Sequence, residues 1–318
     1  MFHFFCFLDI LPGMSKLLLA GTVAYDSLKT PRGERPHILG GSALHAAVAA
    51  SLLARPNLLS VVGGDFERRH LDFLQKYGDT KGIKIIQDGQ TFAWNGFYEQ
   101  DMREAHTVQT DLNVLLQFDP ELPPEYLDSD FVFLGNIDPV LQAKILAQLP
   151  GRKFAAIDTM NYWIAGQKEN LGRVIASADL LFINDAELRQ LTGEDNLLRA
   201  ARSLLGNLKY VVLKKGEHGA LLISAAQVSA VPAMPLAEIV DPTGAGDSFA
   251  GGFMGYVVHS ATSSGVDVDW DTLRAALVYG TMVASFNVQG FGCERLAETS
   301  KTDLDERLKV FREITRIN

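Results

Sequence analysis

The sequence predicts an α/β fold built on a mostly parallel central sheet, and three observations support this prediction. Short apolar runs alternate along the chain with amphipathic stretches. The apolar runs are continuous, as expected for strands that are covered by helices on both faces. Most of them end in Gly, Asn, Asp or Lys, after which a helical pattern follows. This order of elements is typical of repeated βαβ units.

The predicted elements follow one another in this alternating order. Strands are predicted over residues 17–20, 58–62, 131–134, 154–157, 180–183 and 210–213. Helices are predicted over residues 42–54, 66–77, 139–149, 196–205, 246–259, 270–286 and 304–315.

Two stretches break the alternation. Residues 26–39 contain a turn at Pro31-Arg32-Gly33 between short extended pieces. Residues 90–113 contain two strand-like pieces on either side of a turn at residues 101–103. We expect these stretches to form a small sheet outside the main one.

Composition limits the function classes. The chain has 318 residues, of which 47% are hydrophobic and 21% charged, and its formal net charge is -9. No run of Lys or Arg stands out, which argues against nucleic acid as a partner. An anionic ligand would need local positive potential from a helix N-terminus, a cation or one lysine. The two cysteines, Cys6 and Cys293, match no metal or disulfide spacing and fit a reducing, cytoplasmic compartment.

The N-terminal segment is apolar and contains none of the motifs described below. Residues 2–11 are too short to span a bilayer, which needs about 20 residues, and they lack the features of a secretory signal. We therefore expect no membrane association. Residues 1–15 are interpreted as an extension or a misassigned start, and residues 16–318 as the functional domain.

Polar residues follow four of the predicted strands. They are Asn136, Asp158, Asn184 and Lys214. Asn and Asp often form turns, and a turn-forming role alone would explain any single one of these Asn or Asp residues. Ligands of open α/β sheets bind at the carboxyl ends of the strands. Several polar residues at the same edge therefore favour a polar pocket.

The most informative stretch is residues 241–253, DPTGAGDSFAGGF. Small residues at 244–246 let the backbone approach a ligand, and an apolar helical pattern follows. The amide groups at this helix N-terminus can form an anion hole for a transferring phosphoryl group. Asp247 can accept the proton of an attacking hydroxyl, although a first-turn acid is the simpler alternative. No Lys-Ser/Thr pair follows the glycines, so this is not a Walker A loop.

Residues 241–253 resemble the second signature of the ribokinase (PfkB) family of carbohydrate and nucleoside kinases. Four other segments resemble the family in the same order, from about residue 16 to the C-terminus. They are the Gly-Gly block at 40–47, the Asn-x-x-Glu block at 184–187, the strand and turn at 214–220, and the adenine-closing segment at 286–292. The resemblance implies a three-layer α/β/α sandwich with a small β-sheet lid, formed by residues 26–39 and 90–113.

The resemblance also implies roles for individual residues. Asp247 would be the base, and Gly244, Ala245 and Gly246 would supply the anion-hole amides. The implied nucleotide-binding residues are Asn184, Glu187, Lys214, Gly216, Gly219, Thr243, Asn287 and Gly290. The implied substrate-binding residues are Asp26, Gly40, Gly41, Ser42 and Asn136. ATP and Mg²⁺ are the implied cofactors, with Glu187 acting on Mg²⁺ through water. Asp241 is the candidate for a monovalent cation such as K⁺, and a homodimer through the lid is expected.

The acceptor is predicted to be a small molecule, with a sugar or polyol first and a nucleoside as the alternative. The ribose-specific members of the family carry Lys and Asn after the Gly-Gly pair, whereas this chain has Ser42, Ala43, Leu44 and His45. A histidine in such a helix is more often packed or solvent-facing than a ligand contact.

Aromatic residues at the expected lid allow two readings. Trp94, Phe97 and Tyr98 could stack on a sugar or base, or fill the lid.

Two further classes are less favoured. A non-catalytic nucleotide-binding regulator would require a damaged motif, and this one is intact. A dinucleotide-dependent dehydrogenase would require G-x-G-x-x-G after the first strand, where the chain has residues 21–26, GTVAYD.

Overall fold

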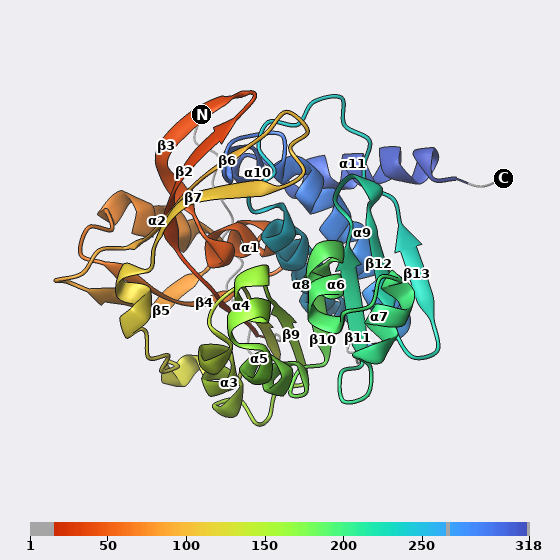
Figure 1. Cartoon of the computed structure of the whole chain (residues 1–318), viewed down its shortest axis with the longest axis horizontal. Helices are drawn as coiled ribbons and strands as arrows, with labels where there is room; N and C mark the ends of the chain where they lie inside the picture. Colours follow the sequence, from red (N-terminus) through yellow and green to blue (C-terminus); the bar gives the residue numbers. More distant parts are fainter. Residues whose placement is uncertain (1–15, 265–267, 317–318) are drawn as a thin grey trace.

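The computed structural model describes residues 16–264 and 268–316. The segment interpreted as an extension, residues 1–15, lies outside them, and so does Cys6. The described residues form two sheets, one large and one small (Figure 1). In the same part of the chain, no helix is both long and apolar enough to cross a membrane.

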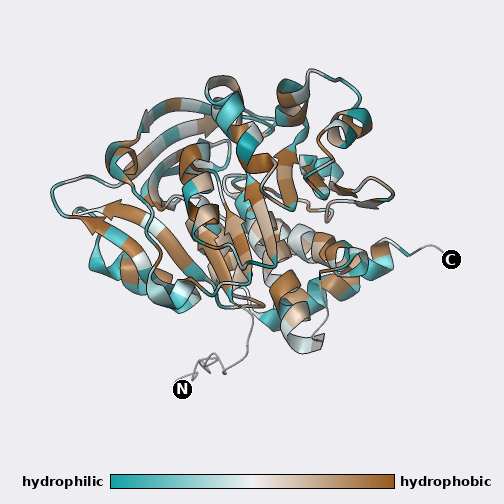
Figure 2. Cartoon of the chain, turned by 90° about the horizontal axis from the view of Figure 1, so that it is seen from below, coloured by the Kyte–Doolittle hydropathy of each residue, from teal (hydrophilic) through white to brown (hydrophobic). Residues whose placement is uncertain are grey.

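The large sheet has nine strands in the order β13-β12-β11-β10-β9-β8-β1-β4-β5. All neighbours are parallel except at one edge, where β12 pairs antiparallel with β11 and with β13. The strands are β1 (Leu17–Ala20), β4 (Asn57–Gly63), β5 (Asp79–Ile86), β8 (Phe131–Leu134), β9 (Phe154–Asp158), β10 (Leu180–Asn184), β11 (Tyr210–Lys214), β12 (Ala220–Ile223) and β13 (Val228–Val231). The central strands consist mostly of apolar residues (Figure 2), and their side chains pack into cores on both faces.

Helices cover both faces of this sheet, which gives three layers. On one face, side chains such as Leu19 and Phe133 pack into a core with α1 (Ser42–Ala50), α2 (Arg68–Tyr77), α8 (Ala245–Ser264), α9 (Trp270–Asn287), α10 (Glu294–Ala297) and α11 (Lys301–Ile314). On the other face, residues such as Leu18 and Val132 pack with α3 (Pro139–Ala147), α4 (Asn161–Gly166), α5 (Lys168–Ile175), α6 (Asp185–Thr192) and α7 (Leu197–Ser203). The predicted α/β sandwich is confirmed.

The small sheet lies at one side of the large one (Figure 1). Its strands are β2 (Ala24–Thr30), β3 (Gly33–Gly40), β6 (Phe92–Tyr98) and β7 (Ala105–Asp111), in the order β3-β2-β6-β7. Both stretches that interrupt the strand–helix alternation contribute to it, and the predicted small sheet is confirmed. Short 3-10 helices complete the fold: η1 (Asn113–Gln117), η2 (Pro124–Tyr126) and η3 (Gly216–His218).

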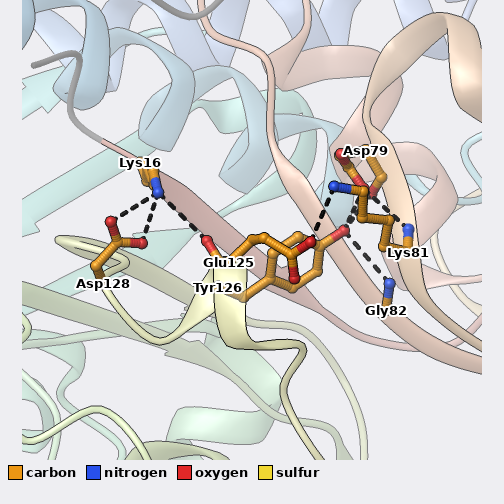
Figure 3. Close-up of polar contacts among 7 residues, drawn as sticks. All are labelled: Lys16, Asp79, Lys81, Gly82, Glu125, Tyr126 and Asp128. Carbon is orange, nitrogen blue, oxygen red and sulfur yellow. Dashed lines mark hydrogen bonds and ion pairs between the residues drawn. The ribbon is translucent and has the colours of Figure 1, made fainter. Parts of the chain in front are cut away.

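A polar anchor fixes the edge strand β5. Tyr126 of η2 is 1% exposed, and its hydroxyl lies 2.6 Å from Asp79 Oδ1 and 3.0 Å from the Asp79 carbonyl oxygen (Figure 3). The same hydroxyl accepts a hydrogen bond from the Gly82 amide at 3.3 Å. Around it, Lys81 pairs with Glu125 and Lys16 with Asp128 at exposed positions, where ion pairs contribute little. The tyrosine is therefore the main polar tether of this edge.

We expect Tyr126→Phe to destabilise the protein by about 1–3 kcal/mol, because it leaves the half-buried Asp79 and the buried Gly82 amide without this hydroxyl partner. The chemical denaturation midpoint measures this effect. The matched control is Tyr162→Phe, since the Tyr162 side chain is 59% exposed. Equal midpoints for the two variants would contradict the assigned role.

Candidate active site

The carboxyl ends of β9, β10 and β11 form one polar edge. Asn184 pairs in register with Lys214, and Phe182 pairs with Asp158. Asn136 follows β8 at the same end of the sheet. The predicted clustering of these four residues is therefore present, and it follows from the parallel arrangement of the strands.

The N-terminus of α8 faces this edge. Gly244 adopts φ +71°, a left-handed conformation that favours glycine. A Cβ atom there would overlap the His45 ring, so the ring packs directly against the loop. The Ala245 amide donates to the Pro242 carbonyl at 3.1 Å and is engaged in the turn. This leaves Gly244 and Gly246 as the better candidates for binding an anion at the helix N-terminus.

A buried network holds the loop in place. Asn287 Nδ2 donates to the Thr243 carbonyl at 2.8 Å, and Asn287 Oδ1 accepts from Ser248 Oγ at 3.0 Å. The same oxygen lies 3.1 Å from His45 Nδ1. Because Asn287 Oδ1 can only accept, His45 Nδ1 carries the proton. Burial lowers the pKa of His45, so the ring is neutral.

Asp241 ties this loop to a distant segment. Its side chain is fully buried, and its Oδ1 accepts from the Thr243 amide while Oδ2 accepts from the Gly292 amide, both at 2.9 Å. Both oxygens therefore hold backbone. Its role in binding a monovalent cation stays a prediction.

Lys214 and Asp158 form the most buried ion pair that the described residues contain. Lys214 Nζ lies 2.6 Å from Asp158 Oδ2, and the two side chains are 17% and 5% exposed. A Cβ atom on Gly246 would lie 3.1 Å from Lys214 Nζ, so the ammonium group sits beside the α8 N-terminus. Burial lowers the pKa of Lys214, but Asp158 and Glu187 outweigh this effect and the pKa is raised. Lys214 is therefore charged.

The Asn-x-x-Glu segment forms a reciprocal cap on α6. Asn184 Oδ1 accepts from the Glu187 amide at 2.8 Å, and Glu187 Oε2 accepts from the Asn184 amide at 2.9 Å. This capping box presents Glu187 to the polar edge. Burial, opposed by Lys214 and reinforced by Asp158, raises the pKa of Glu187 to about 7.

Asp26 lies on β2 of the small sheet and is electrostatically coupled to Asp247. It is 5% exposed, and a Cβ atom on Gly40 would overlap its carboxylate. Gly41 has φ +94°, where a Cβ atom would meet the Thr22 carbonyl. Ser42 Oγ accepts from the Thr22 amide at 3.0 Å, which holds this turn together. Burial raises the pKa of Asp26 to about 7, and Asp241 and Asp247 contribute.

Asp247 stands between the two groups of polar residues. Burial raises its pKa to about 7, Asp158 and Glu187 act in the same direction, and Lys214 opposes them. A carboxylate with this pKa can accept and release a proton near neutral pH. A positively polarised helix N-terminus and a lysine lie beside it. The arrangement can deprotonate a hydroxyl next to a bound anion.

The small sheet contacts the segment that precedes α8. Thr243 Oγ1 donates to Tyr98 OH at 3.2 Å, and Thr30 Oγ1 donates to the Val240 carbonyl at 2.9 Å. Burial raises the pKa of Tyr98 to about 12. Phe97 is exposed and stacks on His106, and Trp94 Nε1 donates to Thr107 Oγ1 within the sheet. Among Trp94, Phe97 and Tyr98, it is Tyr98 that contacts the loop before α8.

Four other predicted residues make their contacts outside the group around Asp247. Asn136 Oδ1 accepts from Trp163 Nε1 at 2.8 Å, so its amide joins α4. Gly219 has φ +82° and packs against the Val231 carbonyl, which shapes the turn before β12 together with Gly216 at φ +52°. Gly290 packs against Arg295. Their roles in binding nucleotide or substrate stay predictions.

Two residues of the site have no individual role assigned to them by the sequence patterns. Asp158 is marked only as one of several polar strand ends, and its partner Lys214 is 56 positions away. His45 is 1% exposed and lies beneath the loop, and the position of its partner Asn287, 242 residues away, gives no local signal. In the sequence, the position of Asp158 at the end of an apolar strand is the one feature that marks it as a candidate site residue.

The residues fit a magnesium ion that arrives with a ligand. Within the described residues, no three His, Cys, Asp or Glu side chains are grouped to hold a metal by themselves. Mg²⁺ usually keeps several waters and uses one or two carboxylates together with phosphate oxygens. Glu187 matches that requirement because its capping box engages only Oε2.

Comparisons with known proteins agree on one family. The model for the pfkB family carbohydrate kinase matches residues 22–300. A cytidine kinase of Thermococcus kodakarensis is 32% identical over 247 residues, covering 76% of this chain and 88% of that protein. The solved nucleoside kinase of Methanocaldococcus jannaschii superimposes with a TM-score of 0.76 at 22% identity, covering 94% and 99% of the two chains. The ribokinase of Giardia lamblia gives 0.77 at 18%, with the same coverage.

We expect the burial of Asp247 to make stability depend on pH. Its pKa is about 7 in the folded chain and 3.8 ordinarily, so the folded state binds the proton more tightly. Its contribution to stability is full below pH 4 and is lost as the pH rises through 7. Because Asp247 is only part-buried, we expect Asp247→Asn to stabilise the protein by about 1–2 kcal/mol at pH 8. At pH 5 the gain should be less than half as large.

Unfolding midpoints of both proteins at the two pH values measure this difference. A control is Asp305→Asn on exposed α11, for which we expect no such pH-dependent gain. A gain for Asp247→Asn of the same size at pH 5 and pH 8 would contradict the assignment.

Proposed function

Because the chain belongs to the pfkB family of carbohydrate kinases, we propose that it transfers the γ-phosphoryl group of ATP to a hydroxyl group of a nucleoside. Family membership makes it a phosphotransferase with an alcohol group of a small molecule as acceptor, and ATP as the phosphoryl donor. The nucleoside, the roles of individual residues and the need for Mg²⁺ are parts of the proposal.

The choice of a nucleoside rests on one observation. The cytidine kinase is similar over most of its own length and most of this chain, at 32% identity. The fold does not distinguish a nucleoside from a sugar as acceptor, since a nucleoside kinase and a ribokinase superimpose on this chain almost equally well. A sugar, the first choice from sequence, therefore becomes the second candidate. The shorter match to a deoxyribokinase of Salmonella typhi, 36% identical over 36% of this chain, keeps it open.

Asp247 acts as the general base in this proposal. The acceptor hydroxyl gives its proton to the Asp247 carboxylate, its oxygen bonds to the γ-phosphorus, and the bond from that phosphorus to ADP breaks. The amides of Gly244 and Gly246 stabilise the charge that develops on the transferred group. Mg²⁺, when bound with the nucleotide, would neutralise phosphate charge near Glu187.

Asp26 binds hydroxyl groups of the acceptor. Its carboxylate is buried against Gly40 at the base of the small sheet and lies close enough to Asp247 to feel its charge. In this proposal the acceptor lies between β2 and the α8 N-terminus. The small sheet, acting as a lid, would exclude water, which otherwise competes as a phosphoryl acceptor.

We expect Asp247→Asn to lower kcat by about 10²–10⁴-fold, because the amide cannot accept the proton. ADP release should be measured with Mg-ATP against cytidine, adenosine, inosine, ribose, fructose and inositol. We expect turnover on a nucleoside, with kcat/KM falling below about pH 7 as Asp247 takes up a proton. Turnover only on sugars would replace the nucleoside by the second candidate. Full activity of the variant would remove Asp247 as the base.

We expect Gly40→Ala to raise the KM for the acceptor by about 10-fold or more while the KM for ATP changes little. The added methyl group would displace the Asp26 carboxylate, and hydrogen bonds to a charged group contribute about 1.5–3 kcal/mol. Gly151→Ala is the matched control, because a Cβ atom there meets open space. If both KM values rise together in Gly40→Ala, Asp26 does not serve the acceptor specifically.

A further inference from the structure

Two residues at the polar edge form a unit that the proposed roles do not explain. Lys214 ends β11 and Asp158 ends β9, and β10 lies between these strands. The 2.6 Å ion pair therefore reaches across the end of the intervening strand. Lys214 is the least exposed lysine or arginine among the ion pairs of the described residues. Since buried ion pairs add little net stability, such a pair calls for another explanation.

The position of the ammonium group supplies one. Lys214 Nζ lies next to Gly246, at the positive end of the α8 dipole. Two positive features that face the same volume repel each other unless an anion lies between or beside them. In this structure the Asp158 carboxylate is that anion. During turnover the transferred phosphoryl group would occupy the same neighbourhood, because Asp247 follows Gly246 directly.

We propose that Lys214 is a catalytic residue that neutralises charge on the transferred phosphoryl group, and that Asp158 is a positioning residue that holds its ammonium group beside Gly246. This inference rests on the phosphoryl transfer of the proposed function but not on the identity of the acceptor. Lys214 keeps its proton throughout, while the proton of the acceptor goes to Asp247 and ADP leaves.

Hydrogen bonds hold Asp158 in a fixed position. Its Oδ1 accepts from the Thr159 amide at 2.9 Å, and its carbonyl accepts from the buried Gln142 Nε2 at 3.0 Å. Only Oδ2 holds Lys214. The lysine side chain, in contrast, is long and flexible. Its ammonium group can turn from the Asp158 carboxylate to a phosphoryl oxygen while the carboxylate stays in place.

The pair also sets the electrostatics of the base. The charged groups around Asp247 include Asp158 and Glu187, which raise its pKa, and Lys214, which lowers it. Asp26 on β2 is also electrostatically coupled to Asp247 and is unchanged in these variants. The rate should fall at low pH as Asp247 takes up a proton, and we call this part of the pH profile its acid limb. Removing the charge of Lys214 and removing that of Asp158 should therefore shift the acid limb in opposite directions. A purely structural role for the pair predicts no such opposition.

The first test compares nucleotides without any acceptor. Lys214→Met and wild type are titrated with Mg-ADP and with the Mg complex of the non-hydrolysable analogue AMP-PNP in a calorimeter. We expect AMP-PNP affinity to fall about 10-fold or more and ADP affinity to change less than threefold, because only AMP-PNP carries the γ-phosphoryl group. An equal loss for both nucleotides, or no loss for either, overturns the role of Lys214. If no nucleoside is a substrate, the proposed function fails, but this comparison of nucleotides still tests the role of Lys214 because it uses no acceptor.

The second test uses turnover of the substrate that the panel identifies. We expect Lys214→Met to lower kcat by about 10²–10³-fold, as for loss of one charge-stabilising donor, with partial recovery in Lys214→Arg. Asp158→Asn should lower kcat by about 10-fold, and its acid limb should shift to lower pH. The acid limb of Lys214→Met should shift to higher pH. Shifts in the same direction, or no shifts, overturn the paired role.

Two further variants separate mechanism from folding. The double variant Asp158→Asn/Lys214→Met removes both charges together, so it leaves no unpaired buried charge and should remain folded even where a single variant does not. Its kcat should match that of Lys214→Met. Lys209→Met is the matched control, because Lys209 pairs with Asp179 at 2.8 Å just before β11, at the opposite end of that strand. If Lys209→Met lowers kcat as much as Lys214→Met, the specific role of Lys214 fails.

Discussion

The close packing of α8 against its neighbours is the constraint on which the site depends. A Cβ atom on Gly251 would overlap the carbonyl of Ala46 in α1, and one on Gly252 would lie 2.8 Å from the Cβ atom of Val283 in α9. Glycines on two faces therefore let α8 lie unusually close to both helices. This approach brings its N-terminus to the carboxyl edge of the sheet. Asp247 then reaches Asp26 on one side and the strand ends on the other.

The close packing of α8 also makes the electrostatic free energy of the site unfavourable. It brings Asp26, Asp158, Glu187 and Asp247 near one another in a chain that is already acidic, and three of these carboxyls have pKa values of about 7. Burying charges without partners is unfavourable. Lys214 and the amides at the α8 N-terminus offset part of that cost. Such unfavourable clusters are typical of functional sites.

The fold was predictable where the sequence pattern is local and apolar. The buried parallel strands and most long helices appear as expected, because continuous apolar runs mark strands with both faces covered. The edge strand β5 was missed because Lys81 and Lys84 interrupt its apolar pattern, and the antiparallel β12 and β13 are only four residues each. Helix α1 also ends at Ala50, earlier than the predicted residue 54. Helix α6 could have been predicted, since Asn184 and Glu187 have the spacing of a capping box.

The site was predictable only where chemistry lies in one contiguous motif. Residues 241–253 pointed to Asp247, whereas contacts between distant segments left no local mark. The lid shows why this matters. Tyr98 of the small sheet accepts a hydrogen bond from Thr243, and Thr243 is held in turn by Asn287 and Asp241. The sheet that carries Asp26 is thus connected to the loop that carries the anion-binding amides. In the proposed reaction, a movement of the small sheet that displaces Asp26 would also break a contact to that loop. Acceptor binding and the geometry of phosphoryl transfer would then be linked through one sheet.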